Sequence, residues 1–209
     1  MKTLLLAGAT GLVGGEVLRL ALADPAVKRV VAPTRRPLAA HPKLENPSVD
    51  FAALPAATWW AVDAVVCTLG TTRRQAGSDA AFRRVDHDYP LAVAAQARAA
   101  GAAAFAFNSS LGADPQARTF YLRVKGETEA ALGRLGFPSL TVVRPGLLGG
   151  RRAEFRPGER VAQILLGLLH PLLPRRYRIV PAAAVARALL AAALAAPPGR
   201  HFVEAEAIR

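Results

Sequence analysis

Short apolar runs and amphipathic segments alternate along most of the chain. The apolar runs, typical of buried strands, fall at residues 3–7, 29–32, 48–51, 64–68, 103–108, 139–144 and 201–204. Helical patterns lie between several of them, at residues 14–23, 79–100, 124–135 and 182–195. Strands that alternate with helices indicate βαβ units and a parallel sheet. We therefore predict an α/β fold: a doubly wound parallel sheet with helices on both faces.

Two segments depart from a simple alternation. The pattern at residues 79–100 is long and contains Pro90, so we expect a bent helix or two helices. Residues 149–179 are irregular and rich in Arg, Pro and Leu. Ligands of a doubly wound sheet bind at the carboxyl ends of strands, so this insertion is either a small substrate-side cap or a purely structural one. The whole chain of 209 residues fits a single domain.

The first strand runs into a glycine-rich turn, GATGLVG at residues 8–14, and a helical pattern follows. Gly8 allows a sharp turn, Gly11 lets backbone amides approach a pyrophosphate, and Gly14 lets the helix lie close to the sheet. The positive end of the helix then faces the phosphates. We predict a dinucleotide site here rather than an ordinary tight turn. Its expected contacts are Gly8, Thr10, Gly11, Leu12 and Val13.

Further cofactor contacts are expected after the next strands. Arg35 and Arg36 stand where an NAD-specific site would carry an acid, and an arginine suits the 2′-phosphate of NADP. The alternative is a pair of solvated surface arginines. Asp50 is predicted either to accept a hydrogen bond from the adenine amine or to cap a turn. Leu69 and Gly70 either approach the cofactor or form a simple turn after the strand.

The candidate catalytic residues are Tyr121, Lys125 and a serine pair. Tyrosine and lysine four residues apart share one face of a helix, and a nearby ammonium favours the phenolate. Ser109 and Ser110 follow the apolar run at residues 103–108, and a serine hydroxyl can polarise a carbonyl or hold an alcohol. The sequence does not distinguish which serine acts.

The charge of the chain is strongly positive, +12 from 27 Lys and Arg against 15 Asp and Glu. Clustered basic residues would favour nucleic acid through counterion release. The arginines here are scattered, without a basic helix or interleaved aromatic residues, so the pattern disfavours direct nucleic-acid binding.

The expected compartment rests on weaker signals. Cys67 is the single cysteine, no signal peptide is apparent, and neither residues 164–173 nor residues 182–196 are long enough to span a bilayer. We therefore expect a cytoplasmic protein without a membrane span.

Together these motifs resemble the atypical, extended branch of the short-chain dehydrogenase/reductase superfamily, whose members are epimerase/dehydratase-like and have a Rossmann fold. The resemblance rests on the glycine turn, the serine pair, Tyr121 with Lys125, and RPG at residues 144–146. More narrowly, SSLGAD at 109–114, YLRVKGE at 121–127 and RPGE at 156–159 are similar to the Tat-interacting-protein type of NADPH-binding oxidoreductase.

This resemblance implies roles for individual residues. Tyr121 would be the proton donor, Lys125 would hold the nicotinamide ribose, and Ser110 or Ser109 would orient the substrate oxygen of a small carbonyl or alcohol. The nicotinamide side would be contacted by Pro145, Gly146 and Leu147. It implies NADP(H) rather than NAD(H) as the cofactor.

Two implications of the resemblance stay open. Many members carry an asparagine for a proton relay where this chain has Asp86, which could instead pair with Arg83. An NADPH-binding regulatory or scaffold protein that acts through a protein partner is the alternative to an enzyme. The oligomeric state, a homodimer included, stays open. We expect no metal, because His87 and His170 lack a ligand arrangement with other donors.

Overall fold

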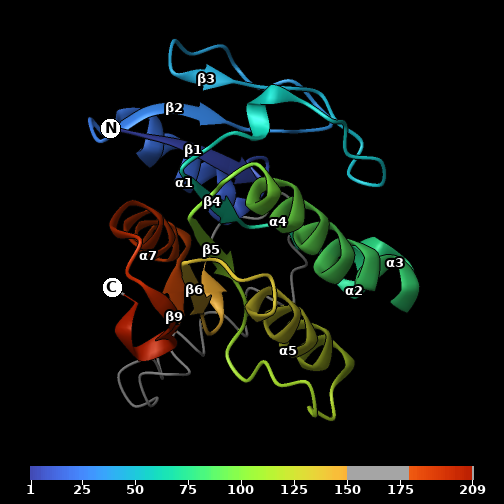
Figure 1. Ribbon diagram of the computed structural model, residues 1–209. Helices are drawn as coiled ribbons and strands as arrows, with labels where there is room; N and C mark the ends of the chain where they lie inside the picture. The colour runs from blue at the N-terminus through green and yellow to red at the C-terminus, as the bar shows by residue number, and fades with distance from the viewer. Residues whose placement is uncertain (150–178, 209) are drawn as a thin grey trace.

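The computed structural model describes residues 1–149 and 179–208, and its centre is a seven-stranded parallel sheet (Figure 1). The strand order is β3-β2-β1-β4-β5-β6-β9. The strands are β1 (Lys2–Ala7), β2 (Val27–Val31), β3 (Leu44–Glu45), β4 (Ala64–Cys67), β5 (Ala104–Asn108), β6 (Ser139–Arg144) and β9 (Gly199–Glu204). The order reverses between β1 and β4, where doubly wound sheets bind their ligands. The predicted Rossmann-type fold is confirmed.

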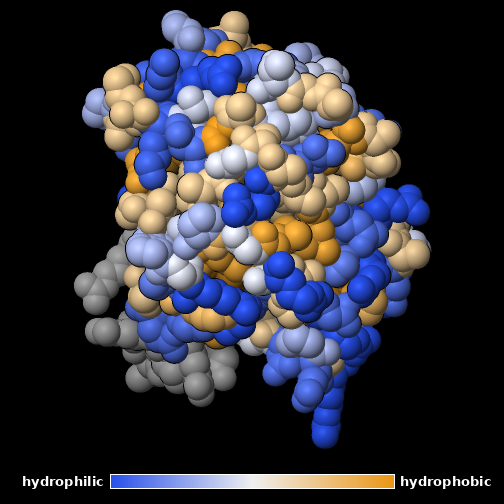
Figure 2. All heavy atoms as spheres, viewed as in Figure 1, coloured by the Kyte–Doolittle hydropathy of each residue, from blue (hydrophilic) through white to orange (hydrophobic). Residues whose placement is uncertain are grey.

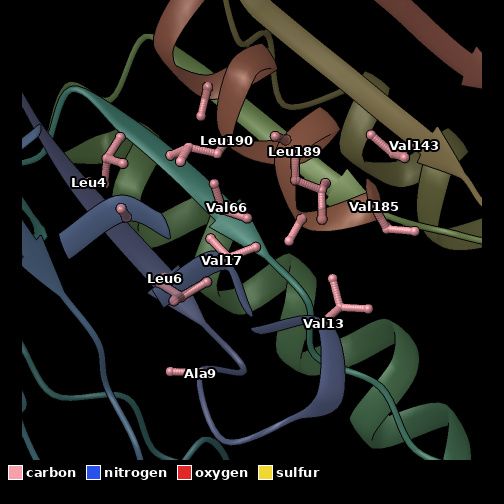
Figure 3. Close-up of a cluster of buried hydrophobic side chains, with 14 of the residues drawn as sticks. Leu4, Leu6, Ala9, Val13, Val17, Val66, Val143, Val185, Leu189 and Leu190 are labelled. Atoms are coloured by element: carbon pink, nitrogen blue, oxygen red, sulfur yellow. The ribbon is translucent and has the colours of Figure 1, made fainter. Parts of the chain in front are cut away.

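Helices cover both faces of the sheet. One face carries α1 (Leu12–Ala23) and α7 (Ala182–Ala195), and the other carries α4 (Tyr89–Ala99) and α5 (Phe120–Gly133). Successive strand residues point to opposite faces. Leu4 and Leu6 therefore pack toward Val17 of α1 and Leu189 of α7 (Figure 3). Leu5 points to the other face and packs with residues of α4. Both faces are apolar because both are covered.

The long helical pattern is divided, as its proline predicts. It consists of α3 (Asp79–Arg83), a π-helical segment η2 (Arg84–Asp88) and α4. Pro90 follows the π-helical segment directly, and the Asp86 carbonyl oxygen, four residues earlier, lies 3.1 Å from the Thr128 hydroxyl in place of a backbone N–H of residue 90. A short helix, α2 (Arg73–Ala76), precedes them. Single π-helical turns inside helices are frequent at functional sites.

The prediction of a strand at residues 48–51 is wrong. Strand β3 lies earlier, at Leu44–Glu45, and Ser48 makes only an isolated bridge to Thr34. Hydrophobic residues at 49 and 51 are buried against the sheet from a loop, which gives a strand-like pattern without strand pairing. Within the described chain, residues 32–43 between β2 and β3 contain no helix.

The remaining elements are short. The sequence did not indicate β7 (Leu148–Gly149) and β8 (Val180–Pro181), which form a separate parallel pair. Three-residue 3₁₀ helices lie at η1 (Thr58–Trp60) and η4 (Ala205–Ala207). Except at its two ends, the expected cap at residues 149–179 lies outside the described residues, together with the RPGE motif and His170.

The positive charge of the described surface is partly compensated. Hydrophilic residues gather over α2, α3 and α5, at the right of Figure 2. Arg73 pairs there with Asp79 at 2.6 Å, and Arg83 pairs with Glu127. These two ion pairs offset part of the basic charge of that face. Among residues 1–149 and 179–208, no helix is both long and apolar enough to cross a membrane.

Candidate active site

The turn after β1 has the geometry of a phosphate cradle. Gly8 has a φ of +92°, and a Cβ on it would lie 2.6 Å from Thr68 Oγ1. A Cβ on Gly14 would lie 2.0 Å from the Gly8 carbonyl oxygen. Only glycine fits at either position. The absence of both Cβ atoms lets the start of α1 lie close to the turn and to the end of β4.

The first turn of α1 leaves its backbone donors free of side-chain caps. Gly11 is the N-cap residue, no side chain caps the helix, and no acidic residue lies in its first turn. The first N–H groups of a helix lack internal partners and attract anions. Val13 is buried in the core and Leu12 packs against it, so at these two positions backbone groups rather than side chains are available.

A pocket lies at the carboxyl ends of β1, β2 and β4. Its lining includes seven of the predicted cofactor residues, from the loops that follow all three strands, together with residues that the sequence did not indicate. The lining residues are Gly8, Thr10, Gly11, Pro33, Thr34, Arg35, Arg36, Phe51, Thr68, Leu69, Gly70, Val85 and Tyr89. The tertiary structure thus brings the glycine turn, the arginine pair and the loop after β4 around one space.

The arginine pair enters the pocket from an anchored backbone. The hydroxyl of Thr34, 4% exposed, donates to the Arg36 carbonyl oxygen at 2.6 Å. Asn46 donates to the same hydroxyl at 2.8 Å. Arg35 and Arg36 are themselves exposed. Their guanidinium groups remain available to an anion while the loop that carries them is fixed.

Asp50 does not line the pocket. Its carboxylate accepts a hydrogen bond from the backbone N–H of Ala52 at 2.9 Å, which is the turn-capping alternative. The neighbouring Phe51 lines the pocket instead, with its ring centroid 5.9 Å from that of Tyr89. Two aromatic rings from distant segments suit a flat base, and nothing local in the sequence links them.

Lys125 and Asp86 form a buried ion pair beside this pocket. Lys125 Nζ lies 2.9 Å from Asp86 Oδ1, and the side chains are 5% and 1% exposed. Burial alone would lower the pKa of Lys125, but the Asp86 carboxylate and Tyr121 together raise it above the ordinary value. Lys125 therefore carries its charge at neutral pH. The alternative pairing of Asp86 with Arg83 is wrong, because Arg83 pairs with Glu127.

The two serines have different surroundings. Ser109 is buried, and its hydroxyl donates to Glu129, which is also buried. Glu129 in turn pairs with Arg144 at 2.6 Å. Ser110 is half-buried, and its hydroxyl has only a long contact of 3.4 Å to the Leu111 carbonyl oxygen. Ser110 is thus the serine whose hydroxyl is available.

Tyr121 lies in the first turn of α5, four residues before Lys125. The residue is 36% exposed, and its ring packs on Phe82 of α3 at 5.8 Å between centroids. The phenol acts electrostatically on Lys125. One helix therefore presents an accessible phenol and a buried ammonium close together. None of Ser109, Ser110, Tyr121 or Lys125 lines the described pocket.

The segment after β6 adjoins the serines. Pro145 is buried and its carbonyl oxygen accepts from Leu111 N–H at 2.8 Å, next to Ser110. Gly146 is half-buried, whereas Leu147 is 57% exposed and accepts from Val180 N–H at 2.8 Å.

In the described part of the chain, no three His, Cys, Asp or Glu side chains gather as a metal site.

The fold is shared with solved structures of nucleotide-binding enzymes. The structure named MoeE5 in complex with UDP-glucuronic acid and NAD has a TM-score of 0.74 and 17% sequence identity. The match covers 96% of this chain and 75% of that one. Identity at this level shows the fold alone.

Curated relatives are more similar in sequence. Protein HTATIP2 of Rattus norvegicus is 40% identical over 195 residues, which are 90% of this chain and 80% of the relative. Protein fmp52, mitochondrial, of Emericella nidulans is 35% identical over 178 residues, 81% of this chain and 76% of the relative.

The relatives correct one expectation. Several are named as mitochondrial proteins, which contradicts the expected cytoplasmic location. A single cysteine and an N-terminus without an apparent signal peptide do not distinguish one reducing compartment from another, so they were insufficient grounds.

No family model matches the chain. The sequence relatives are nevertheless above 30% identity over most of both chains, and the fold is shared with solved structures that include a UDP-Glc/GlcNAc 4-epimerase. The chain belongs to the family of HTATIP2 and the FMP52 proteins.

Proposed function

We propose that this protein is an NADP(H)-dependent oxidoreductase that interconverts a carbonyl and an alcohol on a small substrate. The observation that carries the proposal is the position of the charged Lys125 beside an accessible tyrosine and directly under Gly70. A Cβ on Gly70 would lie 3.6 Å from Lys125 Nζ, and Gly70 itself lines the cofactor pocket. The candidate chemistry thus adjoins the candidate cofactor site.

The residues present fit a dinucleotide. The Gly8 and Gly14 cradle would be filled by any Cβ, the α1 donors are uncapped, and Phe51 with Tyr89 supplies apolar walls. Arg35 and Arg36 would hold a 2′-phosphate through planar, charge-assisted hydrogen bonds. An NAD-type site would have an acid there to bind the ribose hydroxyls. The arginine pair therefore supports NADP(H).

A bound nicotinamide cofactor supplies the hydride, and the chain supplies orientation and the proton. Ser110 donates a hydrogen bond to the substrate carbonyl oxygen and polarises it. Tyr121 transfers its phenolic proton to that oxygen as negative charge develops there. The Lys125 ammonium stabilises the resulting phenolate and offers a donor to the ribose. The reverse reaction uses the same groups with the proton moving the other way.

The proposal is tested by Tyr121→Phe, which keeps the ring packed on Phe82 and removes the proton donor. We expect a loss of turnover of about 100-fold or more, the usual contribution of a positioned acid. NADPH affinity, measured by fluorescence titration, should change less than about twofold because binding and proton transfer use separate groups. Unchanged turnover would exclude Tyr121 as the acid.

A cofactor-binding regulator is the second candidate. It is favoured by one observation: the described pocket is lined from the glycine turn, the arginine loop and α4, not by the four predicted catalytic residues. Such a protein would bind NADPH tightly and show no turnover against a panel of aldehydes and ketones. Turnover that depends on Tyr121 would exclude this function.

A further inference from the structure

The π-helical segment η2 carries a buried charge that the proposed reaction does not itself use. Asp86 is 1% exposed and belongs to η2, between α3 and α4. The Thr128 hydroxyl of α5, itself buried, lies 3.1 Å from the Asp86 carbonyl oxygen and ties the two helices together. A buried carboxylate is costly unless it is paired, so its position requires an explanation.

The two carboxylate oxygens of Asp86 have different partners. Oδ2 accepts a hydrogen bond from the Thr71 backbone N–H at 2.8 Å, in the loop after β4. Oδ1 lies 2.9 Å from Lys125 Nζ. A Cβ on the intervening Gly70 would approach Asp86 Oδ1 to 3.2 Å. One side chain thus fixes the pocket wall and the lysine of the site at the same time.

The environment of Lys125 is otherwise apolar or neutral. The ammonium lies 5.3 Å from the centroid of the Phe107 ring. The ionisable groups that act on it are Asp86 from η2, Tyr121 from its own helix and Cys67 from β4. Burial raises the pKa of Cys67 to about 12, so this thiol is neutral in the physiological range. Asp86 is the anion that compensates the Lys125 charge at neutral pH.

We propose that Asp86 is a positioning residue: it keeps Lys125 charged inside the protein and aims its ammonium at the space under Gly70. This deepens the proposed function, on which it rests for the use of that charge toward the ribose and Tyr121. The carboxylate, unlike a neutral amide, offsets the cost of burying the ammonium. Its second oxygen couples the lysine to the loop that lines the cofactor pocket.

The test is a titration of Lys125 in Asp86→Asn. The chain has four lysines, Lys2, Lys28, Lys43 and Lys125, so NMR of protein labelled with ¹³C-lysine resolves each side chain. The exposed Lys28 serves as the internal reference, and Lys125→Arg assigns the signal. In the wild type, Lys125 should lose its proton at higher pH than an ordinary lysine, because ion pairing outweighs burial. In Asp86→Asn it should titrate about two pH units or more below Lys28, because burial then dominates.

The matched control is Asp88→Asn, which removes a carboxylate from the same π-helical segment. Asp88 is 57% exposed in its side chain and contacts His87, so its loss should leave the Lys125 titration within about 0.3 pH units of wild type. A purely structural role for Asp86 predicts local opening, with Lys125 titrating together with Lys28 in Asp86→Asn. That result, or titration above Lys28, would overturn the proposal.

If Asp86→Asn does not fold, the double variant Asp86→Asn/Lys125→Met is measured instead. Lys125→Met removes the buried ammonium that has lost its partner. Recovery of a cooperative melting transition supports the proposal, and no recovery overturns it. Neither the titration nor the melting experiment requires cofactor or turnover. An inactive wild type would therefore count against the proposed function while leaving this result intact.

Discussion

The two sides of the candidate site are built by different means. The side of the glycine turn depends on backbone geometry, with Gly8 and Gly14 at contacts that no Cβ can enter. The opposite side depends on buried charged side chains, the Asp86–Lys125 and Glu129–Arg144 pairs. The first side needs no particular charge to fold. The second requires each buried charge to keep its partner.

This difference follows from the ligand parts that each side would hold. Phosphates are recognised well by backbone N–H groups at a helix start, which any sequence supplies once glycines allow the approach. Proton transfer needs a charged group held in a dry, fixed position, which only paired side chains supply. Removal of a charge should therefore lower the stability of the side with the ion pairs. Addition of a side chain should lower the stability of the side with the glycine turn.

The largest expected effect on stability is the loss of charge at Glu129. Glu129→Gln should lower the free energy of unfolding by about 3 kcal/mol, because Arg144 loses its buried partner. The matched control is Glu204→Gln, since Glu204 pairs with the same arginine at 3.1 Å but is 43% exposed. It should cost about 0–1 kcal/mol. Urea denaturation measures both, and equal effects would remove the distinction between buried and exposed pairs.

Addition of volume tests the other side. Gly14→Ala should lower the free energy of unfolding by about 2 kcal/mol, because its Cβ would overlap the Gly8 carbonyl oxygen at 2.0 Å. The neighbouring Gly15→Ala is the control, with its Cβ at an ordinary 3.7 Å from the Ala9 carbonyl oxygen. Alanine should stabilise that helical position by up to about 1 kcal/mol. Thermal melting measures both variants. A change in melting temperature of the same sign for Gly14→Ala and Gly15→Ala would contradict the close packing at Gly14.

The smallest effect concerns cofactor choice. Arg35→Ala and Arg36→Ala should each weaken NADPH binding by about tenfold and leave NADH binding nearly unchanged, since only NADPH carries the 2′-phosphate. Arg134→Ala is the control, because Arg134 is exposed at the C-terminal end of α5. Calorimetric titration with both cofactors decides the matter. An equal loss of NADH affinity would show that the arginines do not select between the two cofactors.

Part of the site could be predicted from the sequence because its signals are local. The glycine turn, the split of the long helix at Pro90 and the Tyr121-Lys125 spacing all lie within one or two turns of chain. The prediction of a strand at residues 48–51 was wrong because it also rested on a local pattern. Local apolar residues do not reveal whether a neighbouring strand is free to pair. The contacts of Phe51 with Tyr89 and of Ser109 with Glu129 join distant segments, so no local pattern could indicate them.

By itself, the sequence determined the parallel α/β sheet, the glycine-rich turn after β1 and the placement of Tyr121 and Lys125 on one helix, because periodicity and glycine spacing act over short distances. The tertiary structure alone decided that Asp86 pairs with Lys125 rather than with Arg83, and that Ser109 is engaged by Glu129 while Ser110 is not. Those choices depend on which helices pack together and which side chains they bury. Burial, in turn, makes pairing of charges obligatory.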